Sequence, residues 1–176
     1  MIVTRIIGKE NEKDIRLLNE PFSLFGRLLP SYQNGIWEYT QELFPPDRVS
    51  EMCFPDENYD FDQMCSDHIF IGAYDGDCCV GLAIVQKPWL KYLYLYDFKV
   101  NRSHRSTGAA AQLLEHCCRI ARELGCRGIY TQGQDNNLAA CRFYLKHGFV
   151  IGGLDTMVYN GTSQQGKSDV IFYLDL

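Results

Sequence analysis

Hydrophobic and polar positions along the chain follow patterns that predict a mixed order of strands and helices. Residues 91–100 are rich in aromatic side chains and alternate in size, which is typical of a strand. Residues 107–124 repeat apolar side chains with a helical period, and Gly125 follows as a stop. Further strands are expected over 2–8, 68–74, 78–87, 127–132, 149–158 and 169–175, and helices over 11–19, 35–43 and 136–147. Residues 21–33 are expected to form a loop, and Asp75-Gly76-Asp77 a hairpin turn.

The length and composition indicate one globular domain over residues 1–176. With 46% hydrophobic and 22% charged residues, wholesale disorder is excluded. No apolar run approaches the ~18 residues that a membrane span needs. The first residues are expected to form a strand rather than a signal peptide, so we expect a cytoplasmic protein.

The charge balance argues against nucleic acid or an anionic membrane as a partner. The chain has 17 basic and 22 acidic side chains, a net charge of −5, whereas both of those partners attract basic surfaces. Acidic residues gather between Asp56 and Asp67, with no Lys or Arg among them. This run is either a solvated loop or a site that attracts a cationic substrate.

The eight cysteines do not have the spacing of a metal site or a disulfide framework. Two pairs are adjacent in sequence, and Cys65-x-x-His68 is the only ligand-like spacing. We therefore expect no metal, and free, mostly buried thiols.

A turn after the 91–100 strand has the features of a phosphate-binding site. It reads Val100-Asn-Arg-Ser-His-Arg105-Ser-Thr-Gly108-Ala-Ala110. Small residues fill the first helical turn, so its backbone N–H groups and partial positive charge are open to a pyrophosphate. Arg105 can add a charge-assisted contact. The alternative is a helix that uses its small residues to pack tightly against a neighbour.

A second motif lies in the helix predicted over 136–147. It reads Asn137-x-x-Ala140-x-x-Phe143-Tyr144-x-x-x-Gly148-Phe149. One of the residues at 135–137 should cap the helix, and Gly148 should end it. Asn137, Ala140 and Tyr144 share a face, which presents an amide, a small residue and a phenol. Taken alone, Tyr144 would be a half-buried helix tyrosine.

In this order, the two motifs resemble the acyl-CoA-binding core of the GNAT superfamily of N-acetyltransferases. The resemblance implies an α/β (α+β) fold, with a central mixed, mostly antiparallel twisted sheet of about seven strands flanked by about four helices. It also implies acetyl-CoA as cosubstrate. The cofactor-binding residues that it suggests are Phe98, Lys99, Val100, Arg105, Ser106, Thr107, Gly108, Ala109, Ala110, Asn137, Ala140 and Tyr144.

The resemblance also suggests catalytic roles. The matching tyrosine of GNAT proteins stands beside the thioester sulfur, which implies that Tyr144 serves the leaving thiolate. Many relatives carry an acidic pair where this chain has Tyr96-Asp97, so Asp97 is the candidate general base, acting through water. Strict alternation puts Asp97 on the face opposite Tyr94 and Tyr96, and a bulge, which GNAT folds have here, would alter that parity. A backbone N–H within residues 98–100 could stabilise the oxyanion.

Other residues resemble the streptothricin acetyltransferases within this superfamily. The similar segments are Glu20-Pro21-Phe22, Gly26, Pro30, Tyr32, Trp37, the acidic loop, Thr131 to Tyr144, and Gly148 to Tyr159. The resemblance implies acetylation of the β-lysine amine of streptothricin, an antibiotic-resistance function. The candidate substrate-binding residues are Trp37, Tyr32, Tyr94 and Asp155. Trp37 could equally be core, and Asp155 a surface acid.

Two alternative functions remain open from the sequence. One is a GNAT enzyme for another amine, such as a polyamine, an aminoglycoside, or a protein N-terminus or lysine. The other is a non-catalytic acyl-CoA-binding sensor. Because GNAT chains often pair through their C-terminal strands, the resemblance also allows for a homodimer.

Overall fold

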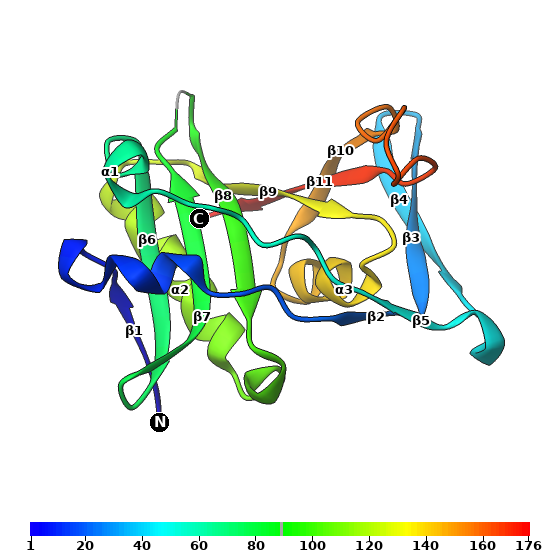
Figure 1. Ribbon diagram of the computed structural model, residues 1–176. Helices are drawn as coiled ribbons and strands as arrows, with labels where there is room; N and C mark the ends of the chain where they lie inside the picture. The colour runs from blue at the N-terminus through cyan, green and yellow to red at the C-terminus, as the bar shows by residue number, and fades with distance from the viewer. Residues whose placement is uncertain (89) are drawn as a thin grey trace. The chain divides into compact units, whose positions relative to one another are not determined.

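Figure 1 shows the computed structural model, which describes residues 1–88 and 90–176. The strands are β1 (Ile2–Ile6), β2 (Phe22–Leu24), β3 (Gly26–Gln33), β4 (Ile36–Leu43), β5 (Ser50–Met52), β6 (His68–Asp75), β7 (Cys78–Gln86), β8 (Tyr92–Val100), β9 (Gly128–Gln134), β10 (Val150–Asp155) and β11 (Asp169–Asp175). The helices are α1 (Phe61–Met64), α2 (Ala109–Glu123) and α3 (Leu138–Lys146), with the 3-10 helices η1 (Lys9–Arg16), η2 (Pro46–Arg48) and η3 (Arg102–His104). Among the described residues, no helix is long and apolar enough to cross a membrane.

Seven strands form one sheet, which confirms the predicted number, in the order β1-β6-β7-β8-β9-β11-β10. Pairs β1–β6, β6–β7, β7–β8 and β10–β11 are antiparallel. Two further sheets have two strands each, β2 with β5 and β3 with β4. The chain groups into two compact units: the first contains residues 1–20, 53–129 and 176, and the second contains 21–52 and 130–175. That residues 1–176 form one domain stays a prediction.

The β6–β7 hairpin is the centre of the first unit, and its predicted turn is confirmed. Asp75 pairs with Cys78, so Gly76 and Asp77 alone connect the strands. Gly76 has a φ of 59°, the left-handed conformation that two-residue hairpin turns demand and glycine accepts without strain.

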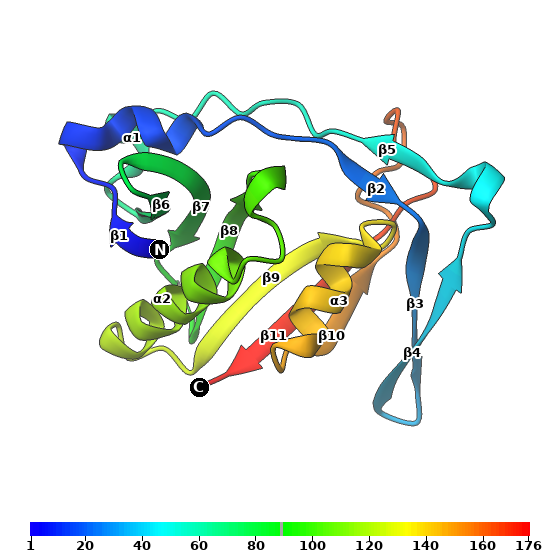
Figure 2. The same cartoon turned by 90° about the horizontal axis from the view of Figure 1, so that it is seen from below.

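Helical segments cover both faces of this hairpin, as Figure 2 shows. On one face, Gly81 lets α2 approach, because a Cβ there would lie 3.1 Å from Leu113. On the other face, Leu82 and Ile84 join a buried cluster that includes Ile15 of η1. A strand buried on both faces reads as a continuous apolar run, which explains the sequence from Val80 to Val85.

In the second unit, the predicted loop over 21–33 and helix over 35–43 are wrong. Both segments form strands, and β3 and β4 make a hairpin in which Gln33 pairs with Ile36. Its turn is Asn34-Gly35, with φ of 51° and 81°, as in a type I′ turn. This dipeptide is a strong hairpin signal that the helix prediction did not weigh.

Helix α3 confirms the second motif's predicted boundaries to within two residues. Asn137 is the cap, since its side chain accepts a hydrogen bond from the Ala140 N–H, and Gly148 follows the helix with a φ of 88°. Tyr144 packs against Phe172 of β11, with ring centroids 5.3 Å apart. Helix α2 likewise ends before Gly125, which has a φ of 68°.

The remaining boundaries differ modestly from expectation. The helix predicted over 11–19 is the 3-10 helix Lys9–Arg16, and α2 begins at Ala109 rather than at residue 107. The strand predicted over 149–158 ends at Asp155, where turns begin.

Gly26 should be the least replaceable glycine of the second unit. A Cβ there would collide with the Glu42 carbonyl oxygen and lie 2.9 Å from Leu138 of α3. We expect Gly26→Ala to lower the free energy of unfolding by about 3 kcal/mol, through overpacking against backbone. Gly35→Ala is the control, because nothing lies within 4 Å and only its positive φ is strained. It should cost about 1 kcal/mol in urea denaturation. Equal losses would contradict the close approach at Gly26.

Candidate active site

One extra residue in β8 decides which side chains of this strand share a face. Asp97 pairs with Ile84 of β7, but Leu95 pairs with the next residue, Val85, so Tyr96 is bulged out. Tyr94, Asp97 and Lys99 therefore lie on one face of the sheet. Strict alternation, which would place Asp97 and Tyr94 on opposite faces, is therefore wrong for β8. The bulge expected as the alternative is confirmed.

The Asp97 carboxylate lies in a polar cluster of the first unit. Tyr59 donates its hydroxyl hydrogen bond to Asp97 Oδ2 at 3.2 Å, and Lys99 Nζ lies 3.1 Å from the same oxygen. The Asp97 side chain is only 15% exposed. Burial raises the pKa of Asp97, while the charge of Lys99 opposes that rise. A raised pKa makes a carboxylate a stronger base near neutral pH.

The acidic loop is largely exposed, but several of its carboxylates are paired. Asp56 accepts a hydrogen bond from the Asn19 backbone N–H, and Glu57 accepts from Lys99 at 2.7 Å. Asp62 pairs with Lys9 at 2.6 Å. These three carboxylates therefore make contacts within the first unit. Through Glu57 the loop reaches the cluster around Asp97.

The predicted phosphate-binding turn has the conformation that anion binding needs. Gly108 is the N-cap of α2 with a φ of 95°, and no side chain caps the helix. The N–H groups in the first turn of α2 have no intrahelical carbonyl as acceptor, because no helical turn precedes them. No capping side chain takes its place. Ser106 also has a positive φ, 65°, and Thr107 donates its hydroxyl to the His104 carbonyl at 2.7 Å. This turn suits the pyrophosphate of an acyl-CoA.

Arg105 makes contacts that the sequence did not suggest. Its Nε donates to the Val100 carbonyl at 3.0 Å, and its guanidinium donates to the Glu20 carbonyl at 3.3 Å. The Glu20 carboxylate accepts from the Arg102 backbone N–H. Arg105 thus ties the turn to the end of β8, and its contact with a pyrophosphate stays a prediction.

The second motif lies in the second unit, and its tyrosine is more buried than a surface helix residue. Tyr144 is 6% exposed, and its ring lies against Phe149 as well as Phe172. Gly133 of β9 lies beside the ring, and a Cβ there would be in ordinary van der Waals contact with it, at 3.6 Å. Ala140 is half-buried on the same helical face. The structure thus fixes the Tyr144 ring by packing on several sides.

The four candidate substrate residues do not form one cluster within a unit. Tyr32 and Trp37 are cross-strand partners on the β3–β4 hairpin, with ring centroids 4.9 Å apart. Tyr32 is 59% exposed and Trp37 is half-buried, so neither is core. Tyr94 lies in the first unit beside Tyr96, at 5.9 Å.

Asp155 has a local structural role. Its Oδ1 accepts hydrogen bonds from the backbone N–H groups of Met157 and Val158, at 2.8 and 3.0 Å. It faces Asp169 across the β10–β11 pair, and Tyr159 donates to Asp169 at 2.7 Å. Burial raises the pKa of Asp169. A contact between Asp155 and a substrate ammonium stays a prediction.

Sequence reasoning missed the residues that surround Asp97. Tyr59 contacts Asp97 directly, and Asn19 and Glu57 contact the neighbouring Lys99, from segments about 40 to 80 positions earlier in the chain. Only the acidic composition of the loop indicated that it could contact these residues, because no sequence periodicity links a loop to a distant strand.

The cysteines are free, as expected, but their burial was overestimated. Three are buried, Cys117, Cys118 and Cys141, while Cys53, Cys65 and Cys78 are exposed. Among the residues that the structure describes, no group of three or more His, Cys, Asp or Glu side chains could hold a metal ion.

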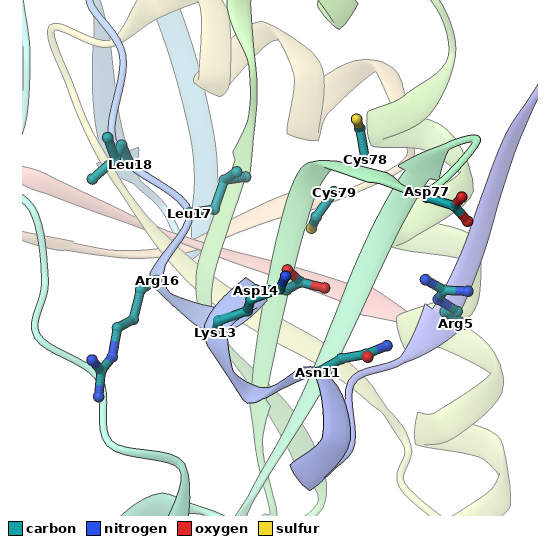
Figure 3. Close-up of a pocket in the computed structure, with 10 residues that line it drawn as sticks. All are labelled: Arg5, Asn11, Lys13, Asp14, Arg16, Leu17, Leu18, Asp77, Cys78 and Cys79. Atoms are coloured by element: carbon teal, nitrogen blue, oxygen red, sulfur yellow. The ribbon is translucent and has the colours of Figure 1, made fainter.

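An open groove of about 610 Å³ in the first unit does not include any predicted site residue. Figure 3 shows its lining, which comes from β1, η1, the residues after η1 and the β6–β7 turn region. Asp14 in this groove accepts a hydrogen bond from Tyr74 at 2.8 Å. Burial raises the pKa of the neighbouring Cys79 thiol to about 11, which keeps it protonated near neutral pH.

Comparison with known proteins identifies the family. Residues 31–149 match the family model described as acetyltransferase (GNAT) family, and the chain belongs to this family. The protein is an acetyl-CoA-dependent N-acetyltransferase. It is 31% identical to streptothricin acetyltransferase A of Bacillus subtilis (strain 168) over 163 residues, which cover 93% of this chain and 94% of that protein.

Two solved structures show the same fold. The first is a streptothricin acetyltransferase candidate from Bacillus anthracis str. Ames in complex with acetyl coenzyme A. It is 28% identical, has a TM-score of 0.87, and covers 100% of this chain and 99% of its own. The second is nourseothricin acetyltransferase, 23% identical with a TM-score of 0.81, covering 99% and 98% of the two chains.

The Asn137 cap can be separated from any other role of this side chain. Asn137→Ala removes the oxygen that accepts from the Ala140 N–H at 3.2 Å, so the free energy of unfolding should fall by about 1 kcal/mol. Asn137→Asp keeps a capping oxygen and should stay within about 0.5 kcal/mol of the wild type. Thermal and urea unfolding would measure both. An equal loss in the two variants would contradict the cap.

Proposed function

We propose that the protein acetylates the β-lysine amine of streptothricin and so confers resistance to it. The observation that carries this proposal is the extent of the likeness to streptothricin acetyltransferase A. That likeness spans 163 residues, whereas the family model matches only 31–149. The shared identity therefore extends into segments that general GNAT chemistry does not require. The net charge of −5 also suits a cationic substrate.

Acetyl-CoA supplies the acetyl group as a thioester. In the first unit, the uncapped N–H groups at Gly108, Ala109 and Ala110 would hold its pyrophosphate, aided by Ser106 and Thr107. In the second unit, Asn137 and Ala140 present an amide and a small residue for the pantetheine arm.

Asp97 is the general base in this proposal. A primary amine with a pKa near ~10 is protonated at neutral pH and must lose a proton before it can attack. The Asp97 carboxylate accepts that proton directly or through a water molecule, and burial makes it a better acceptor. A backbone N–H within Phe98–Val100 stabilises the negative charge that develops on the carbonyl oxygen.

Tyr144 serves the sulfur that leaves. Because a thiol pKa near ~8.5 lies below a phenol pKa near ~10, full protonation of the thiolate by tyrosine is uphill by about 2 kcal/mol. The phenol therefore acts chiefly as a hydrogen-bond donor to the departing thiolate. Tyr32, Trp37, Tyr94 and Asp155 would contact the substrate, the aromatic rings through cation–π interactions.

The substrate is tested by measuring CoA release from acetyl-CoA with streptothricin and with a panel of polyamines, aminoglycosides and lysine peptides. We expect a kcat/KM for streptothricin at least about 100-fold above the others, with the acetyl group on the β-lysine amine by mass spectrometry. Turnover of another amine alone would reject streptothricin but keep the acetyltransferase. Binding of acetyl-CoA without turnover of any amine would favour the sensor alternative.

Replacement of Tyr144 by phenylalanine tests the role at the sulfur. The ring packing against Phe149 and Phe172 is kept, so the fold should hold. We expect kcat to fall by about 100-fold, while the Kd for acetyl-CoA from calorimetry changes less than about threefold. Equal losses in kcat and in acetyl-CoA binding would assign Tyr144 to binding instead.

A further inference from the structure

The Asp97 carboxylate is held through only one of its two oxygens. Tyr59 and Lys99 both contact Oδ2, at 3.2 and 3.1 Å. Within residues 1–88 and 90–176, Oδ1 has no hydrogen bond, and it is not among the fully buried unpartnered atoms. One oxygen is thus anchored, and the other is open to a proton donor.

Lys99 is fixed more firmly than a surface lysine. Its side chain is 12% exposed, and its Nζ lies 2.7 Å from Glu57 Oε2, 3.1 Å from Asp97 Oδ2 and 3.3 Å from Asn19 Oδ1. An ammonium group has three N–H donors, and here three oxygens surround it. Lys99 therefore has no donor left for a phosphate. Any part it takes in cofactor binding is through its backbone.

The surroundings of Lys99 are themselves held in place. Asn19 Nδ2 donates to Glu57 Oε2 at 2.9 Å and to the Pro55 carbonyl at 2.8 Å. The Tyr59 ring lies under the Lys99 ammonium, 5.7 Å from its centroid. The segment before β2 and the acidic loop thus together fix a cation beside Asp97.

We propose that Lys99 is a positioning residue for the general base: with Tyr59 it holds Oδ2 of Asp97, so that Oδ1 receives the proton of the substrate ammonium. The N–H bond breaks and an O–H bond forms at Oδ1, directly or through a water molecule. The amine keeps the electron pair with which it attacks. Glu57 and Asn19 keep Lys99 in place. This inference rests on the proposed role of Asp97 as the base.

The charges around Asp97 predict in which direction its pKa should shift when each one is removed. Lys99 lowers the pKa of Asp97, and Glu57 raises it. Removing the lysine charge should therefore raise the pKa of Asp97, so that the active carboxylate form appears only at higher pH. Removing the glutamate charge should do the opposite. A side chain whose charge does not reach Asp97 would shift neither.

The experiment measures the acidic limb of the pH profile of kcat/KM, together with a ¹³C NMR titration of the Asp97 carboxyl in the free enzyme. We expect Lys99→Met to move both upward by about 0.5 pH units or more, and to lower kcat/KM by about tenfold. Lys99→Arg should restore most of the profile. Glu57→Gln should move both values downward, and Tyr59→Phe upward by less. Unshifted values in Lys99→Met, in a protein that unfolds at the wild-type temperature, would overturn the proposal.

Two controls separate this inference from the proposed function. Lys146→Met removes an exposed charge from α3 and should leave the pKa of Asp97 unchanged. Asp97→Asn tests the base itself and should lower kcat by at least about 100-fold. Full activity in Asp97→Asn would reject the base, although the NMR shift in Lys99→Met would persist. An inactive Asp97→Asn with an unshifted Lys99→Met would reject only the positioning role.

Discussion

The extra residue in β8 sets the chemistry of the first unit. A strand alternates its side chains strictly, so Asp97 would face away from Tyr94 if every residue of β8 paired with one of β7. Bulging Tyr96 out reverses this parity and brings Asp97 and Lys99 onto the face where the acidic loop lies. Burial raises the pKa of a carboxyl group in that position, and the lysine on the same face opposes the rise.

The two motifs use different physical means to prepare a site. The turn before α2 relies on backbone: glycine in the left-handed region leaves donors open, and small side chains leave them uncovered. The α3 motif relies on side-chain packing, since Phe149 and Phe172 lie against the Tyr144 ring. In the proposed function, each solution suits its ligand group, because an anion needs aligned dipoles and a leaving sulfur needs one well-placed donor.

Local sequence signals predicted much of the fold. Periodicity placed β6, β7, β8, α2 and α3, and glycines marked where helices ended. The failure over residues 21–43 has a local cause too. Asn34-Gly35 specifies a tight hairpin, yet Ile36, Tyr39 and Leu43 can also be read at helical spacing. Short apolar runs are ambiguous between the two periods, and here the turn residues were the better guide.

The sequence by itself determined the family, the cosubstrate and the identity of the motif residues, because these depend on residue type at short spacing. Only the tertiary structure decided what surrounds them. Tyr59 meets Asp97, and Glu57 meets Lys99, although about 40 residues separate the partners in the chain. Arg105 donates to the Glu20 carbonyl, from a segment far earlier in the chain. Such contacts arise from how a loop lies over a sheet, and no local period encodes that arrangement. The bulge in β8, whose register depends on pairing with β7, decided which side chains share a face with Asp97.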